Sequence, residues 1–325
     1  MAGTNNQPAT AGVSNTSPIE RLKVVVVAGP TAVGKTALSI ALAQQFGGEI
    51  INADSRYLYR GFDIGVDKPT LAERQGIPHH LIDVLPPAGE MSLARYQDLA
   101  NTAIREVAAH GHVPILAGGT PLYINAVIEG WRIPRVPPDQ AFRARSEAEA
   151  ALDGGASLMQ RLREVDPASA DRCGANIRRV IRALEVYAAT GVPMSAQEGK
   201  GPRPYDALEI GLFRPREELF QIIDRRISAQ IERGLVQEVQ SLLAAGVPAE
   251  APAMSSIGYR QLLPYIDGAV SLADAIERIR FDTHRYVRHQ ETWLRKNALL
   301  VRIDVSADGW QDEATAAVAA FLRSG

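Results

Sequence analysis

The chain has 325 residues, which is enough for a full α/β domain and a smaller second unit. Its formal net charge of -2 argues against a globally basic nucleic-acid binder but leaves room for a local basic patch. Cys173 is the single cysteine, which excludes an intrachain disulfide framework and a cysteine-based zinc finger and favours the cytoplasm as location. No apolar run approaches membrane-spanning length, so we do not expect a membrane protein.

The chain opens with a polar segment and then a buried strand. Residues 1–19 are small and polar, with neither a basic start nor an apolar signal core, so we expect a disordered tail there. The apolar β-branched run Lys23 to Val27 predicts a strand, and residues 37–43 predict a helix.

Between that strand and that helix stands GPTAVGKT, which fits the phosphate-loop pattern G-x-x-x-x-G-K-[ST]. Glycines let the backbone wrap closely around an anion, and the N–H groups at the start of the helix point at it. The residues expected to bind a diphosphate or polyphosphate are Gly29, Pro30, Thr31, Ala32, Val33, Gly34, Lys35 and Thr36. In this pattern Lys35 reaches the outer phosphate oxygens and the Thr36 hydroxyl ligates magnesium (Mg2+).

Strands and helices then alternate as far as about residue 128. We predict strands over 49–53, 79–84 and 113–117, and helices over 92–109 and near 122–124. This order predicts an α/β fold of the phosphate-loop NTPase-like type, a mainly parallel sheet flanked by helices on both faces. Ligands of such sheets bind beyond the carboxyl ends of the strands, so Asp54, Ser55 and Thr120 should cluster around the phosphate loop.

From about residue 131 the pattern changes. Pro134, Pro137 and Pro138 indicate a boundary, and residues 139–190 predict helices with no intervening strand. The predicted division is therefore a core domain over 20–133 and 203–325, with an all-helical insertion over 134–202. In the second half of the core we predict strands over 205–213 and 299–303 and helices over 216–245, 271–296 and 311–322.

Asp54 is the strand-end carboxylate nearest to the loop. Many ATPases hold magnesium with an acidic residue at the end of a later strand, but here the strand over 113–117 ends in Gly118-Gly119-Thr120. An unperturbed aspartate is ionised at neutral pH, so Asp54 could accept a proton from an attacking nucleophile. Taken alone, it could equally be a cap or turn residue in an Asp-Ser pair.

Several further blocks occur in a fixed order. They are Ile51-Asn52-Ala53-Asp54-Ser55, Tyr59-Arg60-Gly61-Phe62-Asp63-Ile64-Gly65, Lys68-Pro69, His79-His80-Leu81-Ile82-Asp83, Gly118-Gly119-Thr120-Pro121-Leu122-Tyr123, Arg179-Val180-Ile181-Arg182-Ala183-Leu184-Glu185-Val186, Ile257-Gly258-Tyr259-Arg260-Gln261 and Gln290-Glu291-Thr292-Trp293-Leu294-Arg295. Together with the loop, this set resembles the tRNA dimethylallyltransferases, which prenylate an adenosine beside the anticodon.

The resemblance implies a reaction and roles for its residues. Dimethylallyl diphosphate would bind in the loop with magnesium, and the exocyclic amine of the adenosine would attack the allylic carbon. Asp54 matches the family's catalytic aspartate, Arg226 aligns with an arginine that holds the diphosphate, and Lys35, Thr36 and Thr120 complete the catalytic set. Without the resemblance, Arg226 would be read as an exposed charge on an amphipathic helix.

The resemblance also implies tRNA, bound through its anticodon arm, as a partner. The target base must leave its stack and enter a pocket, while basic residues hold the RNA backbone. The expected tRNA-binding residues are Asp54, Ser55, Arg56, Tyr57, Thr120, Arg143, Arg178, Arg179, Arg182, Gly258, Tyr259, Arg260, Arg285, Arg288 and His289. Either arginine cluster alone would more often be a solvated face.

Five residues at three places depart from the family pattern. Arg56-Tyr57 replace the usual Met-Gln, Val66-Asp67 replace a usual Thr-Ala, and His289 stands where an arginine is common. Tyr57 could therefore stack on the base where a glutamine would read its edge.

Three further functions stay open on the sequence alone. A phosphate-loop kinase for a small metabolite explains the loop but not the basic helices. A prenyltransferase for free adenine nucleotides and a nucleotide-gated RNA-binding switch also agree with the loop. We expect a tRNA-prenylating enzyme that acts as a monomer.

Overall fold

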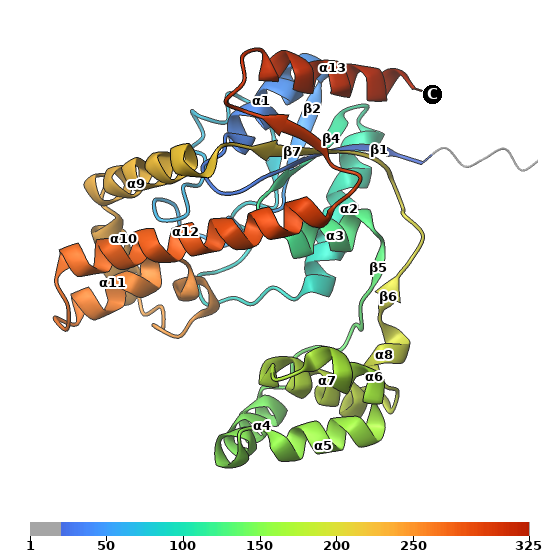
Figure 1. Cartoon of the computed structure of the whole chain (residues 1–325), viewed down its shortest axis with the longest axis vertical. Coiled ribbons are helices and arrows are strands. Elements are labelled where there is room, and N and C mark those ends of the chain that lie inside the picture. Colours follow the sequence, from blue (N-terminus) through green and yellow to red (C-terminus); the bar gives the residue numbers. More distant parts are fainter. Residues whose placement is uncertain (1–20, 325) are drawn as a thin grey trace, which may run out of the picture.

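The core of the molecule is a six-stranded parallel sheet, in a computed structural model that describes residues 21–324 (Figure 1). The strand order is β3-β2-β4-β1-β7-β8, and each neighbouring pair in it is parallel. The strands are β1 (Lys23–Ala28), β2 (Gly48–Asn52), β3 (His79–His80), β4 (Val113–Gly118), β7 (Asp206–Phe213) and β8 (Val301–Asp304). The predicted fold class is confirmed, while the predicted tail at 1–19 lies outside the described residues.

The central strand β1 is apolar because both of its faces are covered. Val24 to Val27 are fully buried, and β4 and β7 flank the strand on either side. A continuous β-branched run is typical of such a doubly covered parallel strand.

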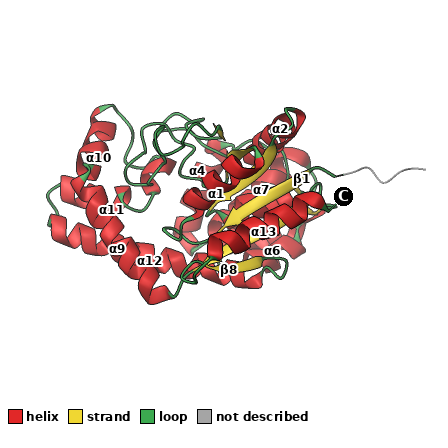
Figure 2. Ribbon diagram, turned by 90° about the horizontal axis from the view of Figure 1, so that it is seen from above, coloured by secondary structure: helices red, strands yellow, loops and turns green. Residues whose placement is uncertain are grey.

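Helices cover both faces of the sheet. In Figure 1, α1 (Lys35–Phe46) and α13 (Trp310–Arg323) lie above it. Below it lie α2 (Leu93–Ala109), α3 (Pro121–Ile128) and the long α12 (Leu272–Lys296). Figure 2 shows α9 (Arg216–Glu232), α10 (Leu235–Ala244), α11 (Tyr259–Ile266) and α12 gathered on one side of the molecule, beyond the sheet. No helix within residues 21–324 combines the length and apolar character needed to cross a membrane.

Between β4 and β7 the chain forms a helical unit away from the sheet (Figure 1). Its helices are α4 (Gln140–Asp153), α5 (Ala156–Val165), α6 (Pro167–Cys173), α7 (Ile177–Thr190) and α8 (Met194–Gln197). They enclose their own apolar cluster, which includes Leu158, Leu162, Val180 and Leu184. A short antiparallel ribbon of β5 (Trp131–Arg132) and β6 (Gly199–Lys200) stands at its base. The division of the chain into domains stays a proposal.

Two predicted elements are wrong in extent. The helix predicted over 216–245 is two helices, α9 (Arg216–Glu232) and α10 (Leu235–Ala244), separated at Gly234 with φ 100°. The strand predicted over 79–84 is only the two residues of β3, because Leu81 and Asp83 have φ of 61° and 58°, outside the extended region.

Several short elements were not predicted. They are the ribbon β5–β6, α8, the 3-10 helix η1 (Pro252–Ser255) and α11 (Tyr259–Ile266). The strands of the ribbon, α8 and η1 are too short to show a period, and α11 contains Pro264. Both η1 and α11 border the cavities described below.

Candidate active site

The phosphate loop joins β1 to α1, and a hydrogen bond between its two ends stabilises it. Gly34 caps the helix with φ 106°, a conformation that favours glycine, and the Lys35 ammonium donates to the carbonyl of Pro30 at 2.8 Å. Burial is the largest influence on Lys35 and lowers its pKa to about 8, with Asp54 opposing and Arg226 reinforcing the shift. A bound anion would stabilise the charged form of this buried lysine, because an opposite charge nearby offsets the cost of burial.

A cavity of 430 Å³, the phosphate cavity, opens in front of this loop. Lys35 and Thr36 line it from α1, Asp54 from the end of β2, and Arg226 from α9. Tyr57 and Asp67 add further polar groups to its wall. The predicted diphosphate residues of α1 and the distant Arg226 thus border one space.

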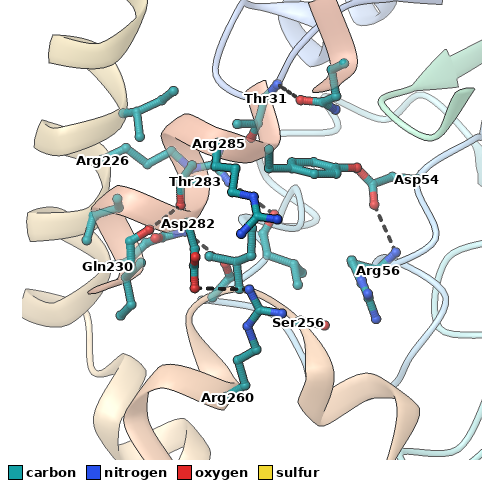
Figure 3. Close-up of a pocket in the computed structure, with 18 of the residues that line it drawn as sticks. Thr31, Asp54, Arg56, Arg226, Gln230, Ser256, Arg260, Asp282, Thr283 and Arg285 are labelled. Carbon is teal, nitrogen blue, oxygen red and sulfur yellow. Dashed lines mark hydrogen bonds and ion pairs between the residues drawn. The ribbon is translucent and has the colours of Figure 1, made fainter. Parts of the chain in front are cut away.

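A turn built by Asn52 holds Asp54 at the end of β2. The Asn52 side chain accepts from the Asp54 N–H at 2.8 Å and donates to the Asp54 carbonyl at 2.9 Å. The Asp54 carboxylate in turn accepts from the Arg56 N–H at 2.9 Å through Oδ1 (Figure 3). One carboxylate oxygen is therefore engaged in the turn, and Asp54 is oriented by backbone contacts.

A second cavity of 440 Å³, the arginine cavity, meets the first at Asp54. Thr31, Asp54, Val66 and Arg226 line both cavities, so the two adjoin and form one site. Figure 3 shows the arginine cavity. The remaining wall of the arginine cavity comes from several elements and includes Ser55, Arg56, Arg260, Asp282, Arg285, Tyr286, His289 and Gln290.

Arg226 lies at the junction of the two cavities. Its guanidinium donates to Thr31 Oγ1 at 3.2 Å and to the Val66 carbonyl at 3.3 Å, and it lies 3.4 Å from the Asp67 carboxylate. Asp67 also pairs with Arg233 at 2.8 Å. The structure thus rules out the reading of Arg226 as a solvated surface charge and places it against the phosphate loop.

Thr120 and Ser55 meet as the strand ends predict. Thr120 Oγ1 accepts from the Ser55 N–H at 3.0 Å, and the Thr120 N–H donates to the Ala53 carbonyl at 3.1 Å. Ser55 lines the arginine cavity. Thr120 therefore ties the end of β4 to the segment that carries Asp54.

Two expected RNA contacts lie in other surroundings. Tyr57 borders the phosphate cavity, where its hydroxyl donates to the Asp67 carbonyl at 2.9 Å, so stacking on a base in the arginine cavity is not its arrangement here. Tyr259 is fully buried and bonds through its hydroxyl to Glu238 and to the Gly65 N–H. Gly258 is buried as well, so Arg260 alone of residues 258–260 is exposed to a ligand.

The arginines of the helical unit divide into two pairs. Arg143 and Arg182 both bond to the carboxylate of Glu185, whose side chain is 2% exposed, at 2.8 and 2.6 Å. Arg178 and Arg179 are exposed on α7. Both arginines are thus held by a buried carboxylate and are only partly exposed, so their contact with RNA stays a prediction.

The cluster on α12 is accessible. Arg288 and His289 are exposed, and Arg285 and His289 line the arginine cavity. Five more residues of the same helix line this cavity and were not predicted, namely Ile279 and Thr283, and Asp282, Tyr286 and Gln290. Their spacing of four residues puts them on one face of a helix, and this spacing is the signal that could have identified them.

The fold and the site define a phosphate-loop α/β enzyme whose anion site is continuous with a second, arginine-lined cavity. The family model described as IPP transferase matches residues 57–297, and the chain belongs to that family. A tRNA dimethylallyltransferase from Thermomicrobium roseum is 52% identical over 94% of this chain and 93% of that relative, and one from Roseiflexus sp. strain RS-1 is 48% identical over 93% and 99%.

Solved structures are similar as well. The tRNA isopentenylpyrophosphate transferase from Bacillus halodurans is 38% identical, with a TM-score of 0.70 over 92% of this chain and 96% of that one. A eukaryotic dimethylallyltransferase described as acting on tRNA is 30% identical, with a TM-score of 0.76 over 92% of this chain and 77% of that one.

Proposed function

We propose that this protein transfers the dimethylallyl group from dimethylallyl diphosphate to the exocyclic amine of an adenosine beside the anticodon of tRNA, and releases diphosphate. The observation that carries the proposal is the position of Asp54 on the wall shared by the phosphate cavity and the arginine cavity. A donor diphosphate in the first cavity and an adenine in the second would meet beside that carboxylate.

The chemistry follows from this arrangement. The amine nitrogen forms a bond to the allylic carbon while the bond from that carbon to the diphosphate oxygen breaks, and its electron pair leaves with the diphosphate. The amine lone pair is delocalised into the ring, so transfer of its proton to Asp54 assists the attack. Asn52 keeps the carboxylate in place through its bonds to the Asp54 backbone.

The leaving diphosphate gains charge in the transition state, and the cations around it lower that barrier. Lys35 and Arg226 reach the phosphate cavity from two elements that are far apart in the sequence. Without a ligand, the Lys35 ammonium bonds to a carbonyl, and the Arg226 guanidinium contacts Thr31, Val66 and Asp67. A bound diphosphate would give both cations a negatively charged partner.

The donor set also fits magnesium. Thr36 is the residue that would hold the ion, and no group of three His, Cys, Asp or Glu side chains suited to a metal occurs within residues 21–324. Mg²⁺ commonly keeps several waters and binds through few protein oxygens plus substrate phosphates. When bound, it would neutralise diphosphate charge.

The tRNA would lie across the arginine cavity, held by Arg260, Arg285 and the exposed residues of α12 and α7. Since residues of one chain line both cavities, we propose that the protein works as a monomer, and we propose the cytoplasm as its location.

The test is incubation of the protein with dimethylallyl diphosphate labelled in the prenyl group, magnesium and unmodified tRNA, with free adenosine monophosphate and labelled ATP as parallel substrates. Label in tRNA at the adenosine beside the anticodon is the expected result. Label in the free nucleotide alone would replace the proposal with nucleotide prenylation, and phosphate transfer from ATP would replace it with a kinase activity. Full activity in excess chelator would remove the role of Thr36 in metal binding.

A further inference from the structure

Gln290 joins three segments that are distant in the sequence. It belongs to α12, and its side chain is among the buried polar groups, 4% exposed. Its Oε1 accepts from the Thr31 N–H of the phosphate loop at 3.0 Å, and its Nε2 donates to the Gly119 carbonyl at the end of β4 at 2.8 Å. The Thr31 end of the first bond is labelled in Figure 3. A buried amide with both groups satisfied fixes its neighbours, because losing either bond leaves an unpaired polar group.

The backbone at Gly119 packs closely against the Gln290 side chain. A Cβ added at Gly119 would lie 2.7 Å from Gln290 Nε2, 3.5 Å from Lys35 Nζ and 3.6 Å from the Gly29 carbonyl. A side chain at position 119 would therefore displace the Gln290 amide, and α12, β4 and the phosphate loop lie close together there. A shift of Gln290 would move the loop directly.

The connection continues to the anion-binding side chains. Thr31, whose N–H is held by Gln290, accepts from Arg226 through Oγ1 at 3.2 Å. On the other side, Arg285, Tyr286 and His289 line the arginine cavity from the stretch of α12 just before Gln290. Tyr286 is four residues before Gln290 and shares its face of the helix, and Arg285 and His289 line the same cavity as the Gln290 amide.

We propose that Gln290 is a positioning residue that couples the two halves of the site, so that tRNA on α12 and the diphosphate in the loop bind cooperatively. The inference rests on the proposed function and adds a route for communication within it. RNA contacts on Arg285 and His289 fix α12; α12 fixes Thr31 through Gln290; and an ordered loop binds diphosphate with less loss of entropy. Linkage then requires the diphosphate to strengthen tRNA binding by the same factor.

The experiment measures pyrophosphate affinity by calorimetry, with and without saturating unmodified tRNA. Pyrophosphate is the released product and undergoes no transfer, so binding is read without turnover. In the wild type we expect tRNA to tighten pyrophosphate binding by about fivefold or more, the lower range of known coupling between sites. In Gln290→Met, which fills the space but removes both bonds, we expect less than about a twofold effect.

Gln97→Met is the matched control. Gln97 is also 4% exposed, and its amide also donates to backbone carbonyls, those of Ala126 and Trp131 at 2.6 and 2.9 Å, outside both cavities. Gln97→Met should lose about as much stability as Gln290→Met, and tRNA should still tighten pyrophosphate binding as in the wild type. If Gln290→Met does not fold, as judged by its melting curve, Gln290→Asn shortens the side chain by one methylene and breaks the same bridge.

The outcomes separate the two proposals. Wild-type coupling in Gln290→Met, or the absence of coupling in the wild type, overturns the role of Gln290. Prenyl transfer by the wild type, measured in its own assay, decides the proposed function independently of that result.

Discussion

Asp54 is the proposed general base, and it can be replaced by a residue that keeps its hydrogen bond within the turn. Asp54→Asn keeps an oxygen that accepts from the Arg56 N–H but removes the proton acceptor. We expect turnover to fall by about 100-fold or more, the usual effect of losing a general base, while pyrophosphate binding persists. Single-turnover prenyl transfer measures the rate, and calorimetry measures the affinity for pyrophosphate.

Asp67→Asn provides the contrast for this prediction. Asp67 borders the phosphate cavity but not the arginine cavity, and it pairs with Arg226. Its substitution should act on the Michaelis constant for the donor more than on turnover. Near-normal turnover in Asp54→Asn would exclude Asp54 as the base.

Lys35 predicts a pH dependence for donor binding. Its pKa in the free protein is lowered to about 8, mainly by burial, whereas a bound diphosphate favours the charged form and raises the pKa again. Binding therefore takes up a proton once the pH exceeds about 8. We expect the dissociation constant of dimethylallyl diphosphate to be flat below about pH 7 and about tenfold higher at about pH 9.

Lys35→Met is the control for that titration. It should bind weakly at every pH and retain only the pH dependence that belongs to the ligand itself. A wild-type curve parallel to that of Lys35→Met would contradict the lowered pKa.

At the scale of elements, the sequence predicts what depends on local pattern and misses what depends on tertiary contact. The run around Val25 and the GPTAVGKT loop identify the first strand and helix, because the run is continuously β-branched and the loop pattern always joins a strand to a helix. The break at Gly234 was missed, because the helical pattern continues on both sides of a single glycine. The predicted strand after His79 is too long, because the positive φ at Leu81 has no signature in that residue type, although Asp83 is of a type that adopts it more readily.

The site follows the same division. Asp54 and Thr120 are strand-end residues, so their neighbourhood follows from the order of the sheet, while Arg226 was recovered only through the family resemblance. The pairing of Arg143 with Glu185 could not be predicted, since it joins α4 to α7 across a fold that local pattern does not determine, whereas Arg182 and Glu185 are three residues apart on α7. Basic residues on a helix look alike in sequence whether they face RNA or a buried carboxylate.

Arg182 accordingly predicts a stability effect. Burial works to raise the pKa of Glu185, but the hydrogen bonds from Arg143 and Arg182 outweigh it and hold that pKa below its ordinary value. Arg182→Ala removes one of these partners, and we expect the free energy of unfolding to fall by about 1.5–3 kcal/mol, the range for a hydrogen bond to a charged group. Urea denaturation at neutral pH measures this change.

Arg178→Ala is the matched control, because Arg178 is exposed on the same helix, and it should cost less than about 0.5 kcal/mol. Because the folded-state pKa of Glu185 is depressed, its stabilisation is present above the ordinary carboxyl value and is lost as the pH falls through the folded value. The difference between the two variants should therefore shrink in acid. Equal stabilities at neutral pH would contradict the role of Arg182.

RNA binding is better tested with the exposed arginines. We expect Arg178→Ala with Arg288→Ala to reduce the slope of log affinity for tRNA against log salt by about 1.4–1.8, two phosphate contacts at about 0.7–0.9 each. Filter binding over a salt series measures the slope. Arg105→Ala with Arg323→Ala removes the same charge from exposed positions on α2 and α13, and it should leave the slope unchanged. Equal slopes for the two double variants would place the RNA path elsewhere.

At the scale of the whole molecule, the separate apolar cluster of the helical unit predicts independent opening. Leu162 is fully buried in that cluster, and Leu162→Ala should cost about 2–5 kcal/mol there. Hydrogen exchange should then accelerate within residues 140–197 and not in the sheet, and tRNA affinity should fall while pyrophosphate affinity stays constant. Leu116→Ala, an equally buried change in β4, should accelerate exchange in the sheet. Faster exchange throughout the chain in Leu162→Ala would mean that the two parts unfold as one.

The ribbon at the base of the helical unit has a practical consequence for protein engineering. Trp131 pairs with Lys200 and Arg132 with Gly199, so the chain leaves the core and returns to it on adjacent strands. Opposed residues of an antiparallel pair lie only about 4.5–5.5 Å apart at their Cα atoms, a gap that a two-residue hairpin turn closes. An Asn-Gly turn joining Arg132 to Gly199 would excise the helices without shifting either strand, and the same two attachment points would accept a transplanted unit from a relative with a different choice of tRNA.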